Sequence, residues 1–255
     1  MGKIIAIANQ KGGVGKTTTC INLTCGLTML GKRVLLCDMD PQSNSTSGMG
    51  IDKNTALPSI YNVLIGTATA EQAIKTTKHG FVLPANRDLS GAGVELVSVE
   101  DREYQLKRVL EPLREHFDYI FVDCPPSLEM LTLNALCAAD SILVPIQCEY
   151  FALQGLGDLV TTLRAIRHRL NPGLEIEGVL LTMYDGRTNL SMQVAAEVKK
   201  YFPGQVYRSV VPRSIRLSEA PSHGKPVLVY DPYSKGSLAY KALAKEVVAR
   251  EEVRK

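Results

Sequence analysis

The stretch that decides the fold runs from residue 10 to residue 18 and reads Gln10-Lys11-Gly12-Gly13-Val14-Gly15-Lys16-Thr17-Thr18. An apolar run at Lys3–Ala8 precedes it, and a helical pattern at Thr17–Leu30 follows it. A buried strand, a glycine-rich turn and a helix in this order are the setting of a phosphate-binding P-loop. The sequence therefore predicts a site that holds the triphosphate of ATP.

The residue types of this loop suit the binding of a polyanion. Glycines let the backbone turn and direct N–H groups at phosphate oxygens, and the helix that begins there directs its positive end at the same anion. We expect Lys16 to reach the β- and γ-phosphates and Thr17 to place its hydroxyl on Mg²⁺. The expected nucleotide-binding residues of the loop are Lys11, Gly12, Gly13, Val14, Gly15, Lys16, Thr17 and Thr18.

The loop departs from the usual pattern G-x-x-x-x-G-K-[ST] at its start. Gln10 stands where a glycine is usual, and Lys11 adds a second lysine. An extra cation so near a triphosphate neutralises phosphate charge, either in its own subunit or across an interface. A solvated loop lysine is the alternative.

Two further apolar runs end in carboxylates. Val34–Asp38 is followed by Asp40, and Tyr119–Asp123 has the four-hydrophobics-then-Asp form of a Walker B strand. Such a carboxylate holds a water of the Mg²⁺ shell, so the expected metal residues are Thr17, Asp38 and Asp123. We expect Asp40 to orient and polarise the attacking water, which makes Lys11, Lys16 and Asp40 the catalytic candidates. Asp38 could instead brace the loop, and both aspartates could cap the segment that follows Pro41.

The remaining pattern indicates one α/β domain spanning residues 1–255. Short runs rich in Val, Ile and Leu read as buried parallel strands at Lys3–Ala8, Val34–Asp38, Phe81–Pro84, Tyr119–Asp123, Ser141–Ile146, Gly178–Met183 and Val206–Val211. Helical patterns at residues 17–30, 156–170, 190–202 and 237–253 alternate with them. The prediction is a P-loop NTPase with a mostly parallel, twisted sheet of about seven to eight strands and helices on both faces. The polar region Ser43–Thr77 is expected to be loops and short helices.

Composition excludes some classes of protein. No window reaches 18 apolar residues, and the apolar start is too short for a signal peptide, so we expect a cytoplasmic protein. Six cysteines without a C-x-x-C pair are expected to be buried and reduced. Residues 187–255 hold 13 basic and 6 acidic residues, a balance of +7 within a net charge of +3. This asymmetry fits a polyanion-binding face or a solvated surface.

The motifs together resemble the deviant-Walker ATPases related to ParA and MinD. The resemblance to the chromosomal ParA branch, called Soj, covers nearly the whole chain. It rests on Lys11–Thr18, Asp38–Gln42, Asp123–Ser127, Gln147–Tyr150 and Pro212–Pro226, the last being the most specific segment.

The resemblance implies properties that spacing alone does not show. Members bind ATP with Mg²⁺ and form a homodimer with two nucleotides sandwiched at the interface. Lys11 matches the lysine that crosses to the partner's phosphates, Gly12 matches the glycine that lets the subunits approach, and Glu149 is expected at the same interface. Pro212 and Arg213 match the loop against the adenine base.

The resemblance also implies macromolecular partners. The ATP dimer would bind double-stranded DNA without sequence preference, and a ParB-like centromere-binding protein would stimulate its slow hydrolysis and release it. Arg187 and Arg216 match arginines that the family uses on DNA, and Lys199, Lys200 and Arg208 are additions from the same basic region. A surface ion pair is the alternative for each. The protein would then be associated with the nucleoid.

The sequence differs from the family pattern in two places, and other functions remain as alternatives. The first strand begins at Lys3, so we expect no N-terminal helix-turn-helix and no operator binding. The helix at Tyr240–Lys255 lacks the basic, aromatic-rich character of the MinD membrane helix, so we expect it to pack on its own domain and the protein not to bind membranes. A MinD-like membrane-site regulator, an electron-transfer ATPase like the nitrogenase iron protein and a plain DNA-binding module remain as alternatives.

Overall fold

A computed structural model gives the fold and describes residues 1–149 and 151–254. Seven strands form a single sheet in the order β3-β4-β2-β5-β1-β6-β7. Their bounds are β1 Lys3–Ile7, β2 Val34–Asp38, β3 Lys75–Thr77, β4 Gly80–Leu83, β5 Tyr119–Asp123, β6 Ser141–Gln147 and β7 Glu175–Thr182. All neighbours pair in parallel except β3 and β4. The predicted fold class is confirmed.

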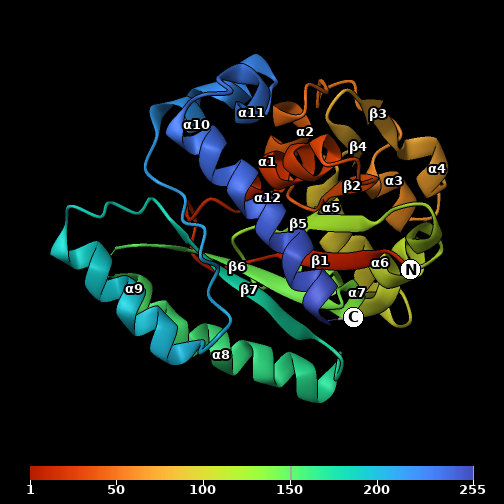
Figure 1. Cartoon of the computed structure of the whole chain (residues 1–255). Helices are drawn as coiled ribbons and strands as arrows, with labels where there is room; N and C mark the ends of the chain where they lie inside the picture. Colours follow the sequence, from red (N-terminus) through yellow and green to blue (C-terminus); the bar gives the residue numbers. More distant parts are fainter. Residues whose placement is uncertain (150, 255) are drawn as a thin grey trace.

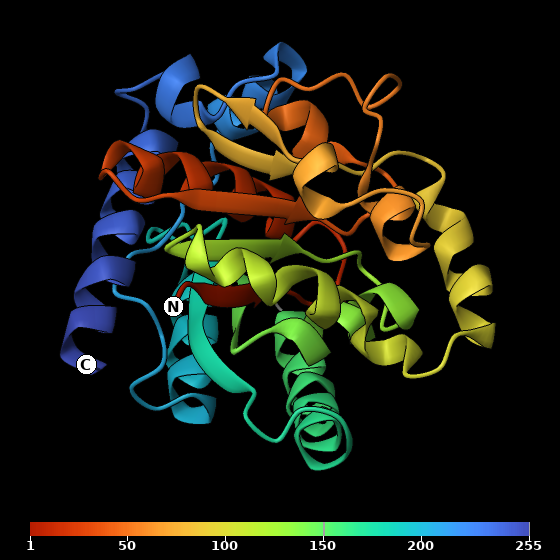
Figure 2. The same ribbon diagram turned by 90° about the vertical axis from the view of Figure 1, so that its right-hand side faces the viewer.

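Helices cover both faces of this sheet (Figures 1 and 2). They are α1 Lys16–Met29, α2 Asn44–Gly48, α3 Ile60–Leu64, α4 Ala70–Ala73, α5 Leu89–Glu95, α6 Gln105–Leu110, α7 Met130–Ala138, α8 Phe151–Arg169, α9 Asn189–Tyr201, α10 Ile215–Glu219, α11 Val227–Tyr230 and α12 Lys235–Arg254. One buried cluster lies under α1, α11 and α12, and a second lies under α5 to α9. The central strands are therefore buried on both sides, which explains their unbroken apolar runs.

The helix after the glycine-rich loop ends as its sequence indicates. Gly31 has a φ of +80°, and its N–H donates to the carbonyl of Thr28. A left-handed residue at this point ends a helix, and glycine adopts that conformation without strain. The predicted helical stretch Thr17–Leu30 thus agrees with α1 to within one residue at each end.

The C-terminal helix packs on its own domain, as its composition predicts. Tyr240, Leu243, Ala244 and Val247 are buried against the core under α1. Lys255, the last residue of the predicted helix, lies outside the described residues. Of the residues that the structure describes, none forms a helix long and apolar enough to cross a membrane.

Two local predictions are wrong. Val206–Val211 is not a strand, because it touches the sheet only through single bridges at Val206 and Pro212. Between them the N–H groups of Arg208 and Ser209 donate to Glu246 of α12, both at 2.8 Å, and so leave the sheet ladder. The region Ser43–Thr77 contains loops and the short helices α2, α3 and α4, as predicted, and the prediction is wrong only for its last three residues, which form β3 and pair with β4 in antiparallel orientation.

Candidate functional site

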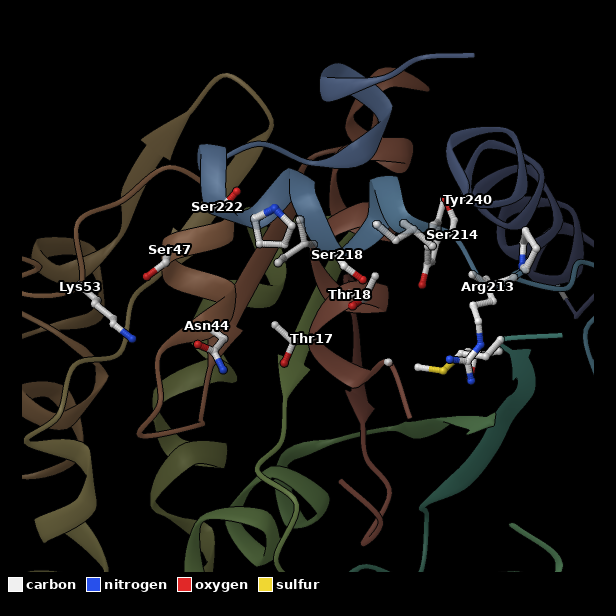
Figure 3. Close-up of a pocket in the computed structure, with 18 residues that line it drawn as sticks. Thr17, Thr18, Asn44, Ser47, Lys53, Arg213, Ser214, Ser218, Ser222 and Tyr240 are labelled. Carbon is white, nitrogen blue, oxygen red and sulfur yellow. The ribbon is translucent and has the colours of Figure 1, made fainter. Parts of the chain in front are cut away.

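The site lies where β1, β2 and β5 end at the same edge of the sheet. Ile7 and Asp38 both stand in register with Asp123, so the ends of the three strands are aligned. Open parallel sheets bind ligands at the carboxyl ends of their strands. A cavity of about 550 Å³ opens here and is lined by residues of the P-loop, α1, α2, α10 and the segment around Pro212 (Figure 3).

The backbone of the glycine-rich loop requires glycine at two positions. Gly13 and Gly15 have φ values of +73° and +93°, which residues with a Cβ rarely adopt. Gly12 differs, because its φ is ordinary and a Cβ placed there would meet nothing within 4 Å. Nothing among the described residues therefore explains the absence of a side chain at Gly12.

The loop holds its lysine in a buried position. Lys16 is only 7% exposed, and its ammonium donates to the carbonyl of Lys11 at 3.1 Å. Burial lowers the pKa of Lys16, and the nearby Asp123 carboxylate acts in the opposite direction. The hydroxyl of Thr182 donates to the carbonyl of Val14 at 2.8 Å and ties the loop to β7. The loop is thus held in position by the protein itself.

Asp38 is fully buried, and both of its carboxylate oxygens accept hydrogen bonds. Oδ2 accepts from the N–H and the hydroxyl of Thr46 at 2.9 and 2.6 Å, and Oδ1 accepts from the N–H of Asp40 at 3.1 Å. Burial raises the pKa of Asp38 to about 6, and the bonds from Thr46 act against the rise. These bonds join Asp38 to Thr46 of α2 and to the turn at Asp40, which is the arrangement expected of a bracing residue.

Asp123 is buried as completely as Asp38, but the surroundings of its carboxylate differ. It is fully buried, and neither carboxylate oxygen has a hydrogen-bond partner among the described residues. The pKa of Asp123 is raised to about 7, mainly by burial and then by the nearby Asp38 carboxylate. The nearby hydroxyls of Thr17 and Ser45 act in the opposite direction without completing a hydrogen bond. A buried unpaired carboxylate is costly, so it marks a place where a cation or its water would bind.

Asp40 is 8% exposed, and its carboxylate lies near enough to Lys16 and Asp123 to raise the pKa of both. Its Oδ1 accepts the N–H of Gln42 at 2.9 Å, so the carboxylate is fixed in direction. Within residues 1–149 and 151–254, no three His, Cys, Asp or Glu side chains could hold a metal by themselves. The donor set fits Mg²⁺, which proteins bind through one or two carboxylates together with substrate phosphates and water.

The expected base-binding loop forms one end of the cavity. Pro212 and Arg213 both line it, and Arg213 donates to Glu149 at 2.9 Å. Glu149, expected at a dimer interface, is thus engaged within its own chain. Tyr150 of the same motif lies outside the described residues.

The expected DNA residues are exposed, but they do not form one cluster. Arg187 makes two hydrogen bonds to Asp185, at 2.9 and 2.8 Å, and Arg216 pairs with Glu219 and Asp231. Lys200 pairs with Glu197, while Lys199 has no partner among the described residues. The two lysines lie at the far end of α9, about 15 Å along the helix from its first residue near Arg187.

Sequence reasoning missed several residues that line the cavity. They are Ile21, Asn44, Ser47, Lys53, Thr182, Met183, Val211, Ser214, Leu217, Ser218, Pro221, Ser222 and Tyr240. Six of them are small polar residues, and the set has no recognisable spacing. The one available signal was their position after strand ends or within the specific segment Pro212–Pro226.

All six cysteines are buried and free, as predicted. Burial raises the pKa of each of the thiols nearest the site, Cys20, Cys37 and Cys124. Raised pKa values keep these thiols protonated and unreactive at neutral pH.

Comparison with known proteins gives consistent results. Residues 2–176 match the family described as "AAA domain". The sporulation initiation inhibitor protein Soj of Bacillus subtilis (strain 168) is 56% identical, over 98% of this chain and 99% of that protein. The chromosome-partitioning ATPase Soj of Treponema pallidum (strain Nichols) is 47% identical, over 98% and 99%. A Mycobacterium smegmatis structure described as cobyrinic acid a,c-diamide synthase with bound ADP and magnesium has a TM-score of 0.88 at 38% identity, covering 100% of this chain and 97% of that one.

Proposed function

This chain belongs to the Soj/ParA family of chromosome-partitioning ATPases, and from that membership we propose a DNA-segregation switch driven by ATP. In this proposal the whole chain acts as one ATPase domain. It binds ATP with Mg²⁺, dimerises, binds DNA without sequence preference and leaves the DNA after hydrolysis.

The observation that carries the ATPase proposal is the contrast between two buried carboxylates. Asp38 accepts hydrogen bonds from Thr46, whereas Asp123 has none among the residues that the structure describes and lies beside Lys16 and Thr17. We assign Thr17 and Asp123 to the Mg²⁺ shell, with Asp38 behind them as the brace. A bound Mg²⁺ would neutralise charge on the β- and γ-phosphates.

The catalytic assignments follow from placement around this cation. Lys16 is held at the base of the loop, ready to contact phosphate oxygens, and the Gly13 and Gly15 turns leave backbone N–H groups for the same purpose. Asp40, fixed by the Gln42 N–H, orients the attacking water. Hydrolysis is proposed to be slow and to depend on Mg²⁺.

The dimer proposal rests on Lys11 and Gly12. The Lys11 ammonium has no partner in the part of the chain that the structure describes, and the space over Gly12 is open. Both features suit a second subunit that approaches the loop and shares its phosphates. Glu149 joins the interface by releasing Arg213.

The DNA proposal rests on exposed cations that are only weakly engaged. Ion pairs at fully exposed positions contribute little to stability because water screens them, so Arg187 and Arg216 can exchange their carboxylates for DNA phosphates at little cost. Lys199 and Lys200 would extend the contact. Such binding would weaken steeply with salt, and a ParB-like partner would trigger release and leave the protein distributed over the nucleoid.

The test measures phosphate release from ATP with and without Mg²⁺, non-specific DNA and a ParB-like protein bound to its site. We expect slow basal turnover that needs Mg²⁺ and rises when DNA and the partner are both present. Turnover that neither addition changes would contradict the partitioning function while leaving a simple ATPase.

A further inference from the structure

Lys53 is a cation of the nucleotide cavity that the motifs do not assign. It lies in the loop after α2, far in sequence from the P-loop, and its side chain is half-buried. It lines the same cavity as Thr17 and Asn44. Figure 3 shows its side chain entering from the side opposite Arg213, with the ammonium pointing towards Asn44 and Thr17. The cavity therefore has a cationic group at each end.

The ammonium of Lys53 is held by a single protein acceptor. It donates to the carbonyl of Gln42 at 2.8 Å, and the described residues provide no carboxylate partner for it. A lysine ammonium has three N–H donors, so two remain available for a ligand in the cavity. A half-buried cation without a counter-ion, facing an open cavity, favours an anionic ligand.

The contact with Gln42 links Lys53 to the proposed catalytic carboxylate. The Gln42 N–H donates to Oδ1 of Asp40, and the Gln42 carbonyl accepts from Lys53. One residue thus stands between the lysine and the group that would orient water. An anion bound by Lys53 would be coupled through this turn to Asp40.

We propose that Lys53 is a further polyphosphate-binding residue, which bridges the phosphate chain of the nucleotide to the turn that holds Asp40. This inference rests on the proposed ATP-binding function. Lys16 contacts the phosphates from the P-loop, and Lys53 contacts them from the side of α2. The ligand it selects is a nucleoside di- or triphosphate, because a monophosphate carries less charge and lacks the β- and γ-phosphates that Lys16 is expected to contact.

The experiment titrates AMP, ADP and ATP, each with Mg²⁺, into wild-type protein and three variants by calorimetry. Lys53→Gln keeps a hydrogen-bond donor for Gln42 but removes the charge, and Lys53→Arg keeps the charge. Lys75→Gln is the matched control, because the Lys75 ammonium also donates to a backbone carbonyl, that of Leu57 at 3.1 Å, but does not line the cavity.

We expect Lys53→Gln to weaken ADP and ATP binding by about tenfold, the typical loss for a charge-assisted hydrogen bond, and to leave AMP binding unchanged. Lys53→Arg should restore most of the affinity, and Lys75→Gln should bind like wild type. Equal losses for AMP, ADP and ATP would show a role in shaping the cavity only and would overturn the proposal, as would unchanged ATP affinity. Failure of the wild-type protein to bind ATP would instead refute the proposed function itself.

Discussion

The P-loop region and the basic region around Arg187 and Arg216 place their charges in opposite ways. At the strand ends, Lys16, Asp38 and Asp123 are buried, and hydrogen bonds with the backbone already fix Lys16 and Asp38 before any ligand arrives. Arg187 and Arg216, in contrast, are exposed, and each is paired with a neighbouring carboxylate. A buried, pre-arranged site suits chemistry that needs defined geometry, whereas exposed and exchangeable ion pairs suit a partner bound only through its phosphates.

The largest effect is expected in the P-loop region, where Asp40→Ala should lower the partner-stimulated rate of ATP hydrolysis by about 100-fold or more. ATP and DNA binding should remain, because the P-loop and the basic region are unchanged. Phosphate release is the measurement. Asp118→Ala is the control, since Asp118 also accepts one backbone N–H, at 2.7 Å, but does so at the opposite edge of the sheet. Turnover near the wild-type rate would show that Asp40 does not orient the water.

Substitution of the exposed arginines should change DNA binding but not ATP binding. Arg216→Glu should weaken DNA retention by at least about tenfold at low salt, because it replaces a phosphate contact with a like charge, while ATP-dependent dimerisation persists. A gel-shift series in salt measures this. Arg108→Glu is the matched control, because Arg108 is similarly exposed and ion-paired, with Asp101, outside the basic region. A normal shift for Arg216→Glu would remove the basic region from the DNA interface.

The buried carboxylates should also make the nucleotide-free protein sensitive to pH. The pKa of Asp123 is raised to about 7 from 3.8, so the folded state keeps a proton that the unfolded state loses between about pH 4 and pH 7. The free energy of unfolding should therefore fall as pH rises through this window. Asp123→Asn removes the part of this slope that Asp123 contributes, while Asp38, whose pKa is also raised, keeps its own part. The variant should be more stable than wild type by roughly 2–4 kcal/mol at pH 8, with little difference near pH 4.

Urea unfolding at several pH values measures this slope. Asp118→Asn, at an exposed carboxylate, should keep the wild-type slope. A parallel pH dependence for Asp123→Asn and wild type would mean that the Asp123 carboxylate is satisfied in the folded protein, contrary to the unpaired geometry.

The sequence predicted the site best where the role of a residue depends on local backbone geometry. Gly13, Gly15 and the strand ending in Asp123 could be predicted because loop turns and buried parallel strands leave recognisable patterns. Val206–Val211 also has the composition of a strand. The N–H groups of Arg208 and Ser209 in its middle donate instead to Glu246 of a helix some 40 positions later, and no local pattern contains that competition.

The cavity itself illustrates a second limit. Lys53 and Ser222 come from polar stretches without periodicity, and only the packing of α2 against the helical turn Ala220–His223, which follows α10, brings them together. The different surroundings of Asp38 and Asp123 could not be predicted either, because each residue ends a buried strand. They depend on Thr46, which satisfies one carboxylate and not the other. Long-range packing decides such cases.

In the proposed function, the P-loop is half of a switch that a second subunit completes across Gly12. The most direct test compares Asp40→Ala with Gly12→Val/Asp40→Ala by size-exclusion chromatography with ATP, where the first change keeps ATP unhydrolysed. A Cβ at Gly12 meets nothing within its own chain, and Gly93→Val, another open position, is the control in the same background. We predict a dimer for Asp40→Ala and for the control, and a monomer for the Gly12→Val double variant with ATP still bound. A dimer in the double variant would contradict the claim.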